Sequence, residues 1–470
     1  MIIDDMVATA VATIKQELER FAQEAEQDLT AELAERATRA VQQAVCAAGR
    51  AAFRTFIESK ETAAERVVVD GEEFRFKYVS SKSFLTLWGK EAFKRRVYQN
   101  ASDTQSVAPL DRTWGMEKQY LTLEVRESVA FALAHLTPVE AVQFFKKCAS
   151  SYVPHATQMK QAAAEVAQAL RAHEQEVLGG IREAQGIPEG LKALAVSADG
   201  ANVLMREAGA AKRGRPAERP GRSPAQSENT AYRNAMAGAL SFYGAVPQGG
   251  KTPQRLGSLY SSHMPEERAP TFKQKFEAEV KAAEQGAPEG IAKVVLCDGA
   301  RALWKYVEET PLFEDYERLV DYWHSAEHLS LAAEALFGKG TDEAKRWYKK
   351  YKGKLLEEDD GVEALLRSTK YYEQARDLPA ARRHDLQAQR TFFVRNRARM
   401  TYADFRRRGL PIGSGPVEAA CKTLIKARLC QSGMRWTAGG GQNILDLRTY
   451  VKSNRWDPMW QAYKELVNAA

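Results

Sequence analysis

The sequence is poor in cysteine. Its 470 residues include five cysteines, none in a Cys-x-x-Cys pair, so neither a disulfide framework nor a closed zinc site is indicated. The sequence also has no run of about 18 apolar residues, the length that a membrane-spanning helix needs. It begins with MIIDD instead of the basic and apolar regions of a secretory signal. These absences predict a cytoplasmic protein with reduced thiols and no membrane segment.

Two phosphate-binding fingerprints are absent as well. The G-x-G-x-x-G pattern of dinucleotide-binding folds is not met at residues 199–204, and no G-x-x-x-x-G-K-[ST] loop occurs. Enzymes that depend on a nucleotide cofactor are therefore disfavoured.

What the chain does have is length and clustered positive charge. Its length is about three times that of a typical domain, which predicts several cores. Its 44% hydrophobic and 27% charged residues are near globular averages. The 68 Lys and Arg exceed the 61 Asp and Glu, and they gather in three stretches, at residues 212–222, 390–408 and 422–428. Clusters of this kind favour a polyanionic partner, although charge runs are also common on solvated faces.

The first 190 residues indicate mainly helices. Apolar positions at helical spacing predict a long helix or helical hairpin from about Met6 to Lys60. Two strand-like runs around Asp70-Gly71 predict a β-hairpin over residues 67–78. Further helices are expected at residues 121–134, 138–148 and 155–184. These short helices fit either a helix-turn-helix DNA reader or an ordinary small bundle.

The pattern changes at Leu191. Short apolar strands alternate with helices, which predicts a mixed α/β sheet. One strand is expected to end at Asp199-Gly200, followed by a basic, Pro/Gly/Ser-rich loop from Arg206 to Arg233. Residues 325 to about 408 are charged and helical throughout, which indicates an all-α insertion before the α/β pattern returns near Leu410.

Three carboxylates stand out in this region. Apolar strands end in Asp-Gly-Ala at Asp199 and again at Asp298, and Glu418 lies in the first turn of a predicted helix. Ligands of α/β sheets bind at the carboxyl ends of strands, and paired carboxylates there suit Mg²⁺. The alternative is structural, because Asp-Gly is a common turn dipeptide and Glu418 stands where a capping glutamate pairs with Lys422.

The order of these residues resembles a known family. Asp199, Asp298, a helical insertion and Glu418 follow one another as in DDE transposases with an RNase H-like core, and the tail is similar to the ISKra-four family of bacterial insertion-sequence transposases. The segments that carry the likeness are GSG at residues 413–415, EAACK at 418–422, RL at 428–429, SGMRW at 432–436 and GGQNIL at 440–445. The likeness covers the chain from about Leu191 onward and, more loosely, the segment from Pro109.

The resemblance implies hydrolysis of a phosphodiester at transposon ends and transfer of the freed 3′-hydroxyl into target DNA. It implies two Mg²⁺ or Mn²⁺ ions held by Asp199, Asp298 and Glu418. The partners would be double-stranded DNA, as terminal repeats and target, and further copies of the chain in a homodimer or larger homo-oligomer in the nucleoid. Two alternatives stay open, a catalytically silent DNA-binding or regulatory protein derived from a transposase, and a nuclease on the same core.

The expected fold is a multidomain α/β protein in four parts. They are an N-terminal helical region at residues 1–65, a hairpin plus helical DNA-binding region at 66–188, an RNase H-like mixed sheet with helices at 189–324 and 410–470, and an all-α insertion at 325–409.

DNA contacts are expected from the basic clusters, since lysine and arginine bind phosphates without sequence preference. The predicted contact residues are Lys212, Arg213, Arg215, His324, Arg406, Arg407, Arg408, Lys422, Lys426 and Arg428.

The entry to the insertion carries a second signature. Asp321 and His324 resemble the Asp/Cys-x-x-His motif of transposase superfamilies with an insertion at this point. His324 would orient a phosphate or anchor the insertion to the core; a metal pair with His328 is conceivable but lacks a third ligand. Family members often carry cysteine pairs ahead of residues 109–111, and residues 98–110 contain none, so a zinc ribbon is not expected.

Overall fold

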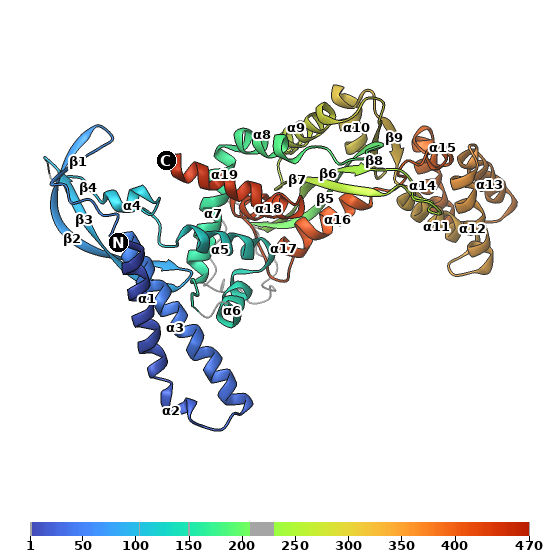
Figure 1. Cartoon of the computed structure of the whole chain (residues 1–470). Coiled ribbons are helices and arrows are strands. Elements are labelled where there is room, and N and C mark those ends of the chain that lie inside the picture. Colours follow the sequence, from blue (N-terminus) through green and yellow to red (C-terminus); the bar gives the residue numbers. More distant parts are fainter. Residues whose placement is uncertain (1, 103, 149–150, 207–229, 470) are drawn as a thin grey trace, which may run out of the picture. The chain divides into compact units, whose positions relative to one another are not determined.

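The computed structural model describes residues 2–102, 104–148, 151–206 and 230–469. By its internal contacts the chain forms two compact units, Met1–Leu178 with Trp456–Ala470, and Gly179–Arg455 (Figure 1). The sequence prediction assigned residues 456–470 to the catalytic core, whereas the structure groups them with the N-terminal part. No helix among the described residues is long and apolar enough to span a bilayer.

The first unit begins with two long helices that pack along each other, which confirms the predicted helical hairpin. The Thr30 hydroxyl caps the second of them by accepting the Leu33 N–H at 3.1 Å. The helices described in this unit are α1 (Ile2–Glu19), α2 (Ala22–Ala25), α3 (Ala31–Glu58), α4 (Pro109–Thr113), α5 (Leu123–His135), α6 (Pro138–Cys148), α7 (Ala156–Ala172) and α19 (Trp456–Ala469), while α8 (Glu174–Gln185) crosses into the second unit.

The predicted hairpin is part of a larger sheet. Asp70 and Gly71 adopt positive φ angles of 53° and 82° in a two-residue turn, as the Asp-Gly pair predicts. The sheet continues beyond it as four antiparallel strands, β1 (Arg66–Val69), β2 (Glu72–Thr86), β3 (Gly89–Asn100) and β4 (Ser106–Val107). Phe84 and Phe93 face Trp114 in its core. The expected helices at 121–134, 138–148 and 155–184 also form, the last as α7 and α8 with a break at His173.

The second unit is built on a five-stranded mixed sheet in the order β7-β6-β5-β8-β9. The first three strands are antiparallel, and β5, β8 and β9 are parallel, which is the RNase H-like topology expected from the sequence. The strands are β5 (Ala193–Arg206), β6 (Thr230–Tyr243), β7 (Arg255–His263), β8 (Ala292–Cys297) and β9 (Glu317–Val320).

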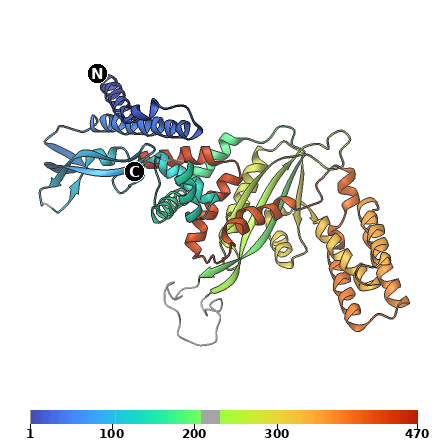
Figure 2. The same ribbon diagram turned by 90° about the horizontal axis from the view of Figure 1, so that it is seen from below.

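Helices cover both faces of this sheet (Figures 1 and 2). On one face lie α9 (Pro270–Gly286) and α10 (Arg301–Glu309). Gly238 of β6 lets Phe276 of α9 come so close that a Cβ would lie 2.6 Å from its ring. The other face carries α16 (Gly415–Ala420), the π-helical segment η3 (Cys421–Lys426), α17 (Ala427–Leu429) and α18 (Ala438–Lys452).

The predicted all-α insertion is a helical bundle beside β9 (Figure 1). It consists of α11 (Tyr322–Phe337), α12 (Asp342–Glu357), α13 (Gly361–Ala375), α14 (Ala380–Asn396), the short 3₁₀ turn η2 (Arg397–Arg399) and α15 (Tyr402–Arg407). Apolar side chains of these helices, such as Leu329, Leu365 and Leu386, are fully buried in one core with the sheet. The insertion is therefore packed structure and not a long loop.

Two expectations about β5 and β6 are wrong. Asp199-Gly200 is not a turn, because β5 continues through it and Asp199 pairs with Ala237. The alternating burial of Ala201 and Val203 after it is the strand signal that the Asp-Gly pair obscured. The loop was also predicted to extend to Arg233, whereas residues from Thr230 onward belong to β6. The predicted DNA contacts Lys212, Arg213 and Arg215 lie outside the described residues.

Candidate functional site

Two of the predicted carboxylates lie level on neighbouring parallel strands. The pairing of β5 with β8 runs from Ala193 opposite Ala292 to Val196 opposite Val295. Three residues further along the same register stand Asp199, inside β5, and Asp298, directly after β8. The mixed sheet thus brings together two acidic residues that are 99 positions apart in the sequence.

The protonation of Asp199 depends on its burial and on the neighbouring charge of Asp298. Burial is the main cause that raises the pKa of Asp199, and the charge of Asp298 raises it further. The Gly200 N–H, the Cys421 thiol and the Lys426 cation act in the opposite direction. A partly buried carboxylate that repels its neighbour gains by binding a cation, which is the electrostatic condition for a metal ligand.

Asp298 is held by the loop that follows β8. Its Oδ1 accepts the Ala300 N–H at 2.9 Å, and its backbone oxygen accepts the Trp304 indole N–H at 2.7 Å. Next to it, Gly299 lies so close to Phe392 of the insertion that an added Cβ would lie 2.4 Å from the ring. The Arg395 guanidinium donates to the Gly299 oxygen at 3.0 Å. The insertion therefore contributes directly to the shape of this loop.

A third aspartate ends the next strand, and hydrogen bonds occupy it. The Asp321 N–H donates to the Cys297 oxygen at 2.8 Å, so Asp321 lies beside the residue that precedes Asp298. Its Oδ1 accepts the His324 N–H at 2.8 Å, and its Oδ2 accepts both the hydroxyl, at 2.9 Å, and the backbone N–H of Ser414. The side chain is 1% exposed. Asp321 thus fastens the start of the insertion to the segment that returns from it.

Cys297 marks the centre of this acidic region. Burial raises the pKa of its thiol to about 12, and the charges of Asp298, Asp199 and Asp321 raise it as well. A buried thiol with so high a pKa stays protonated and unreactive. The thiol lies close enough to all three aspartates for each of their charges to raise its pKa.

Glu418 lies on the helix that covers β5. Its side chain is 49% exposed, and Oε2 is 3.9 Å from the Lys422 Nζ, as the i,i+4 interpretation predicted. The capping interpretation is wrong, because the N-cap is Ser414 and no side chain caps this helix. One turn later, the Cys421 thiol donates a hydrogen bond to Asp199; burial raises its pKa most strongly, and the charge of Glu418 also contributes. Glu418 therefore lies on an exposed part of the helix, near Cys421, which in turn bonds Asp199.

The structure brings Asp199 and Asp298 together, and it places Glu418 beside this pair rather than within it. Among the described residues, no three His, Cys, Asp or Glu side chains are placed to hold one metal ion. The sequence analysis missed Cys421, whose i,i+3 spacing from Glu418 was the available signal. It also missed the contacts of Phe392 and Arg395 with the Asp298 loop, which depend on tertiary packing alone.

The predicted DNA contacts in the described residues have different surroundings. Lys426 is exposed and lies close enough to lower the pKa of Asp199. Arg428 is 1% exposed and lies over the Trp436 ring at 5.4 Å, so a direct DNA contact by this side chain is not supported. The reason is geometric, because residues two apart on a helix do not share a face, and Arg428 follows exposed Lys426 by two.

The arginines at the end of the insertion are already paired. Arg407 bonds Asp359 at 2.8 Å, and Arg408 bonds Glu317 at 2.5 Å; these contacts raise the pKa of both guanidinium groups. Arg406 is half-buried and reaches the Leu356 oxygen at 3.5 Å. The three residues are thus less available as a free cationic patch than their sequence suggests.

His324 packs on the inner side of the insertion. Its ring contacts His328 and Phe392, with ring centroids 4.9 and 5.7 Å apart. His328 stacks on Phe392 at 3.6 Å and bonds Gln389 at 2.6 Å, and burial lowers its pKa. These contacts join α11 to α14 within the insertion, so an anchoring of the insertion to the core by the His324 ring stays a prediction.

No family model matches the chain, and no curated protein matches it. Among solved structures, it is similar to a chain of the Drosophila P element transposase strand transfer complex, with 9% sequence identity and a TM-score of 0.26 over 75% of this chain and 82% of that one.

Proposed function

We propose that this chain is a DDE-type DNA transposase related to the ISKra-four family, which hydrolyses a phosphodiester at transposon ends and transfers the freed 3′-hydroxyl into target DNA. The observation that carries the proposal is the level placement of Asp199 and Asp298 on adjacent parallel strands of an RNase H-like sheet, with the Glu418 helix against β5.

The carboxylates suit the metal that this chemistry uses. Carboxylate oxygens are preferred ligands of Mg²⁺ and Mn²⁺, and the mutual repulsion of Asp199 and Asp298 is relieved when a cation binds. Asp199 and Asp298 would hold the two ions, and Glu418 is the third ligand that the family resemblance assigns. When bound, the ions lower the pKa of the attacking water or hydroxyl and stabilise the departing oxygen.

The other residues position these ligands. The Gly200 N–H and the Cys421 thiol lower the pKa of Asp199 and so offset part of the effect of burial. The Ala300 N–H fixes one oxygen of Asp298, and Asp321 fixes the strand end next to it. The exposed Lys426 is placed to attract a DNA phosphate to this edge of the sheet.

The test is a cleavage assay on a labelled duplex that carries the element end, taken from DNA flanking the coding sequence, with Mg²⁺, Mn²⁺ or EDTA. We expect metal-dependent nicking and joining, and a loss of roughly 100- to 1,000-fold in Asp298→Asn, as for removal of several kcal/mol of transition-state stabilisation. The exposed Asp315→Asn is the matched control.

The same assay separates the alternatives. Binding of the duplex without cleavage at any metal concentration would identify a silent DNA-binding protein. Cleavage without joining would identify a nuclease on the same core. Full activity of Asp298→Asn would refute the assignment of this carboxylate.

A further inference from the structure

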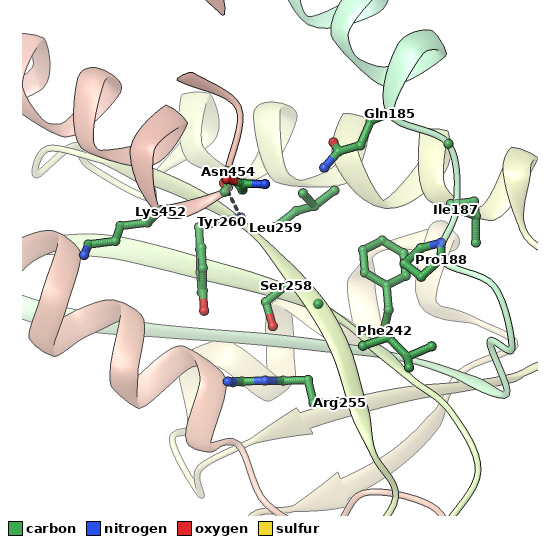
Figure 3. A pocket seen from close by; sticks show the side chains of 14 residues that line it. Gln185, Ile187, Pro188, Phe242, Arg255, Ser258, Leu259, Tyr260, Lys452 and Asn454 are labelled. Atoms are coloured by element: carbon green, nitrogen blue, oxygen red, sulfur yellow. Dashed lines mark hydrogen bonds between the residues drawn. The ribbon is translucent and has the colours of Figure 1, made fainter. Parts of the chain in front are cut away.

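A cavity lies along the edge strand β7, two strands away from the β5 strand that carries Asp199. It has a volume of about 530 Å³ and is lined by β7, by the segment after α8 and by the end of α18 (Figure 3). Its volume is within the range of small-molecule sites and exceeds that of a single inorganic anion. None of the carboxylates discussed above lines it.

The polar side of the cavity is cationic. Arg255 and Lys452 line it together with the hydroxyl groups of Ser258 and Tyr260, and its lining contains no acidic residue. Figure 3 shows these four side chains gathered on one side of the strand. Neither Arg255 nor Lys452 forms an ion pair within the part of the chain that the structure describes. Two unpaired cations and two hydroxyl groups are a suitable donor set for a phosphate group.

The other side of the cavity is apolar. Ile187, Pro188 and Phe242 lie across the strand from the cations in Figure 3. Ile187 and Pro188 are half-buried, which leaves part of their surface open to a ligand. A ligand that fills both sides needs an anionic group joined to a compact apolar or aromatic group.

The wall between the two sides is fixed before any ligand binds. The Ser453 hydroxyl accepts the Tyr260 N–H at 3.0 Å. Arg455, 4% exposed, bonds Gln185 at 2.7 Å and Glu279 at 3.0 Å. These bonds hold the turn at Asn454, whose φ of 55° is left-handed. A site that is already rigid loses little ordering entropy when a ligand binds.

We propose that this cavity binds a nucleotide unit, with its phosphate on Arg255 and Lys452 and its base against Ile187 and Pro188. The unit comes either from a DNA strand that passes over the edge of β7 or from a free nucleoside phosphate. This site is separate from the Asp199–Asp298 pair and takes no part in the proposed cleavage.

The test uses the full chain in EDTA, so that no cleavage occurs. Deoxyadenosine monophosphate and a mixed-sequence single-stranded 12-mer are titrated separately, and amide hydrogen exchange of residues 255–260 and 452–455 locates the binding. We expect Arg255→Gln and Lys452→Gln each to weaken binding at least about 10-fold and to abolish the protection. Lys281→Gln, which removes an exposed cation of α9, should leave both unchanged.

The two probes distinguish the source of the nucleotide. Protection by the monophosphate supports a free nucleotide, and protection by the 12-mer alone supports a DNA strand. The proposal fails if neither probe protects these segments, if the variants bind as tightly as the wild type, or if a poly-glutamate peptide binds there in preference to both. Since the assay contains no metal, such a failure leaves the proposed phosphodiester chemistry untouched.

Discussion

Asp199 and Asp321 stand at the same edge of one sheet, and their surroundings differ in kind. All the acceptor positions described for Asp321 are used within the chain, by His324 and Ser414. From the residues that the structure describes, Asp199 accepts only the Gly200 N–H and the Cys421 thiol, and the negative charge of Asp298 lies near it. An aspartate on this sheet is therefore not a ligand by its position alone. What distinguishes the two is whether the fold has already satisfied the carboxylate.

The largest effect is expected at Asp321. Asp321→Ala would leave three buried donors, from His324 and Ser414, without an acceptor, and we expect a loss of roughly 3 kcal/mol in the free energy of unfolding. Urea denaturation followed by circular dichroism measures it, with exposed Asp315→Ala as control. If Asp321→Ala unfolds like the wild type while Asp199→Ala is strongly destabilised, then Asp199, and not Asp321, is the carboxylate that stabilises the fold.

The stability of Asp199→Asn relative to the wild type should depend on pH. The pKa of Asp199 is raised above its ordinary 3.8 in the folded chain, so the folded state binds this proton more tightly. The resulting stability is complete below pH 3.8 and is lost as pH rises through the folded pKa. Above that window Asp199→Asn should therefore be the more stable protein, and the difference should disappear as the pH falls.

The direction of this pH dependence is checked by urea unfolding of the wild type and Asp199→Asn at a series of pH values from 4 to 8. A wild type that gains stability over Asp199→Asn as the pH rises would mean that partners within the chain hold Asp199 ionised.

A smaller effect is expected at Cys421. Its thiol donates to Asp199 and lowers the pKa of that carboxyl. Cys421→Ala removes the donor, so the acidic limb of the pH–rate profile for cleavage should move to higher pH. Cys421→Ser keeps a donor and should retain the wild-type profile. Identical profiles for all three proteins would leave the thiol with a packing role only.

The smallest effect concerns salt. Lys426 is exposed and has no ion pair with the residues that the structure describes, so Lys426→Ala should reduce the slope of log K against log salt by about 0.9, the contribution of one phosphate contact. Arg407 and Arg408 are paired with acidic residues, so the double alanine variant should change the slope by less. The reverse order would show that those ion pairs open when DNA binds.

The dipeptide Asp-Gly shows what the sequence could and could not predict. At Asp70-Gly71 it forms the expected turn, because two short strands of one hairpin meet there. At Asp199-Gly200 the same pair lies inside a strand, since β6 pairs with it along its whole length and Asn234 fills the space beside Gly200. Local propensity is equal in the two cases, and long-range pairing decides.

For the candidate site, too, local patterns in the sequence were informative and long-range contacts could not be predicted. The alternation of strands and helices was sufficient to predict the mixed sheet and the helical insertion. The contact of Cys421 with Asp199 and that of Phe392 with Gly299 join segments more than 90 residues apart, and no spacing within either segment reveals them.

The π-helical turn at Cys421–Lys426 makes the hydrogen bonding of Arg448 sensitive to chain length. Its widened turns leave the Thr423 and Leu424 oxygens free to accept the buried Arg448 guanidinium, at 3.0 Å for Leu424. An in-frame deletion of one codon here would let the helix close to ordinary α geometry. Because a π turn holds about one residue more than an α turn, the helix on either side would keep its phase, and Arg448 would lose these two acceptors. For this part of the gene, a lost codon should therefore act through one buried arginine and not through a rotation of the helix that carries Glu418.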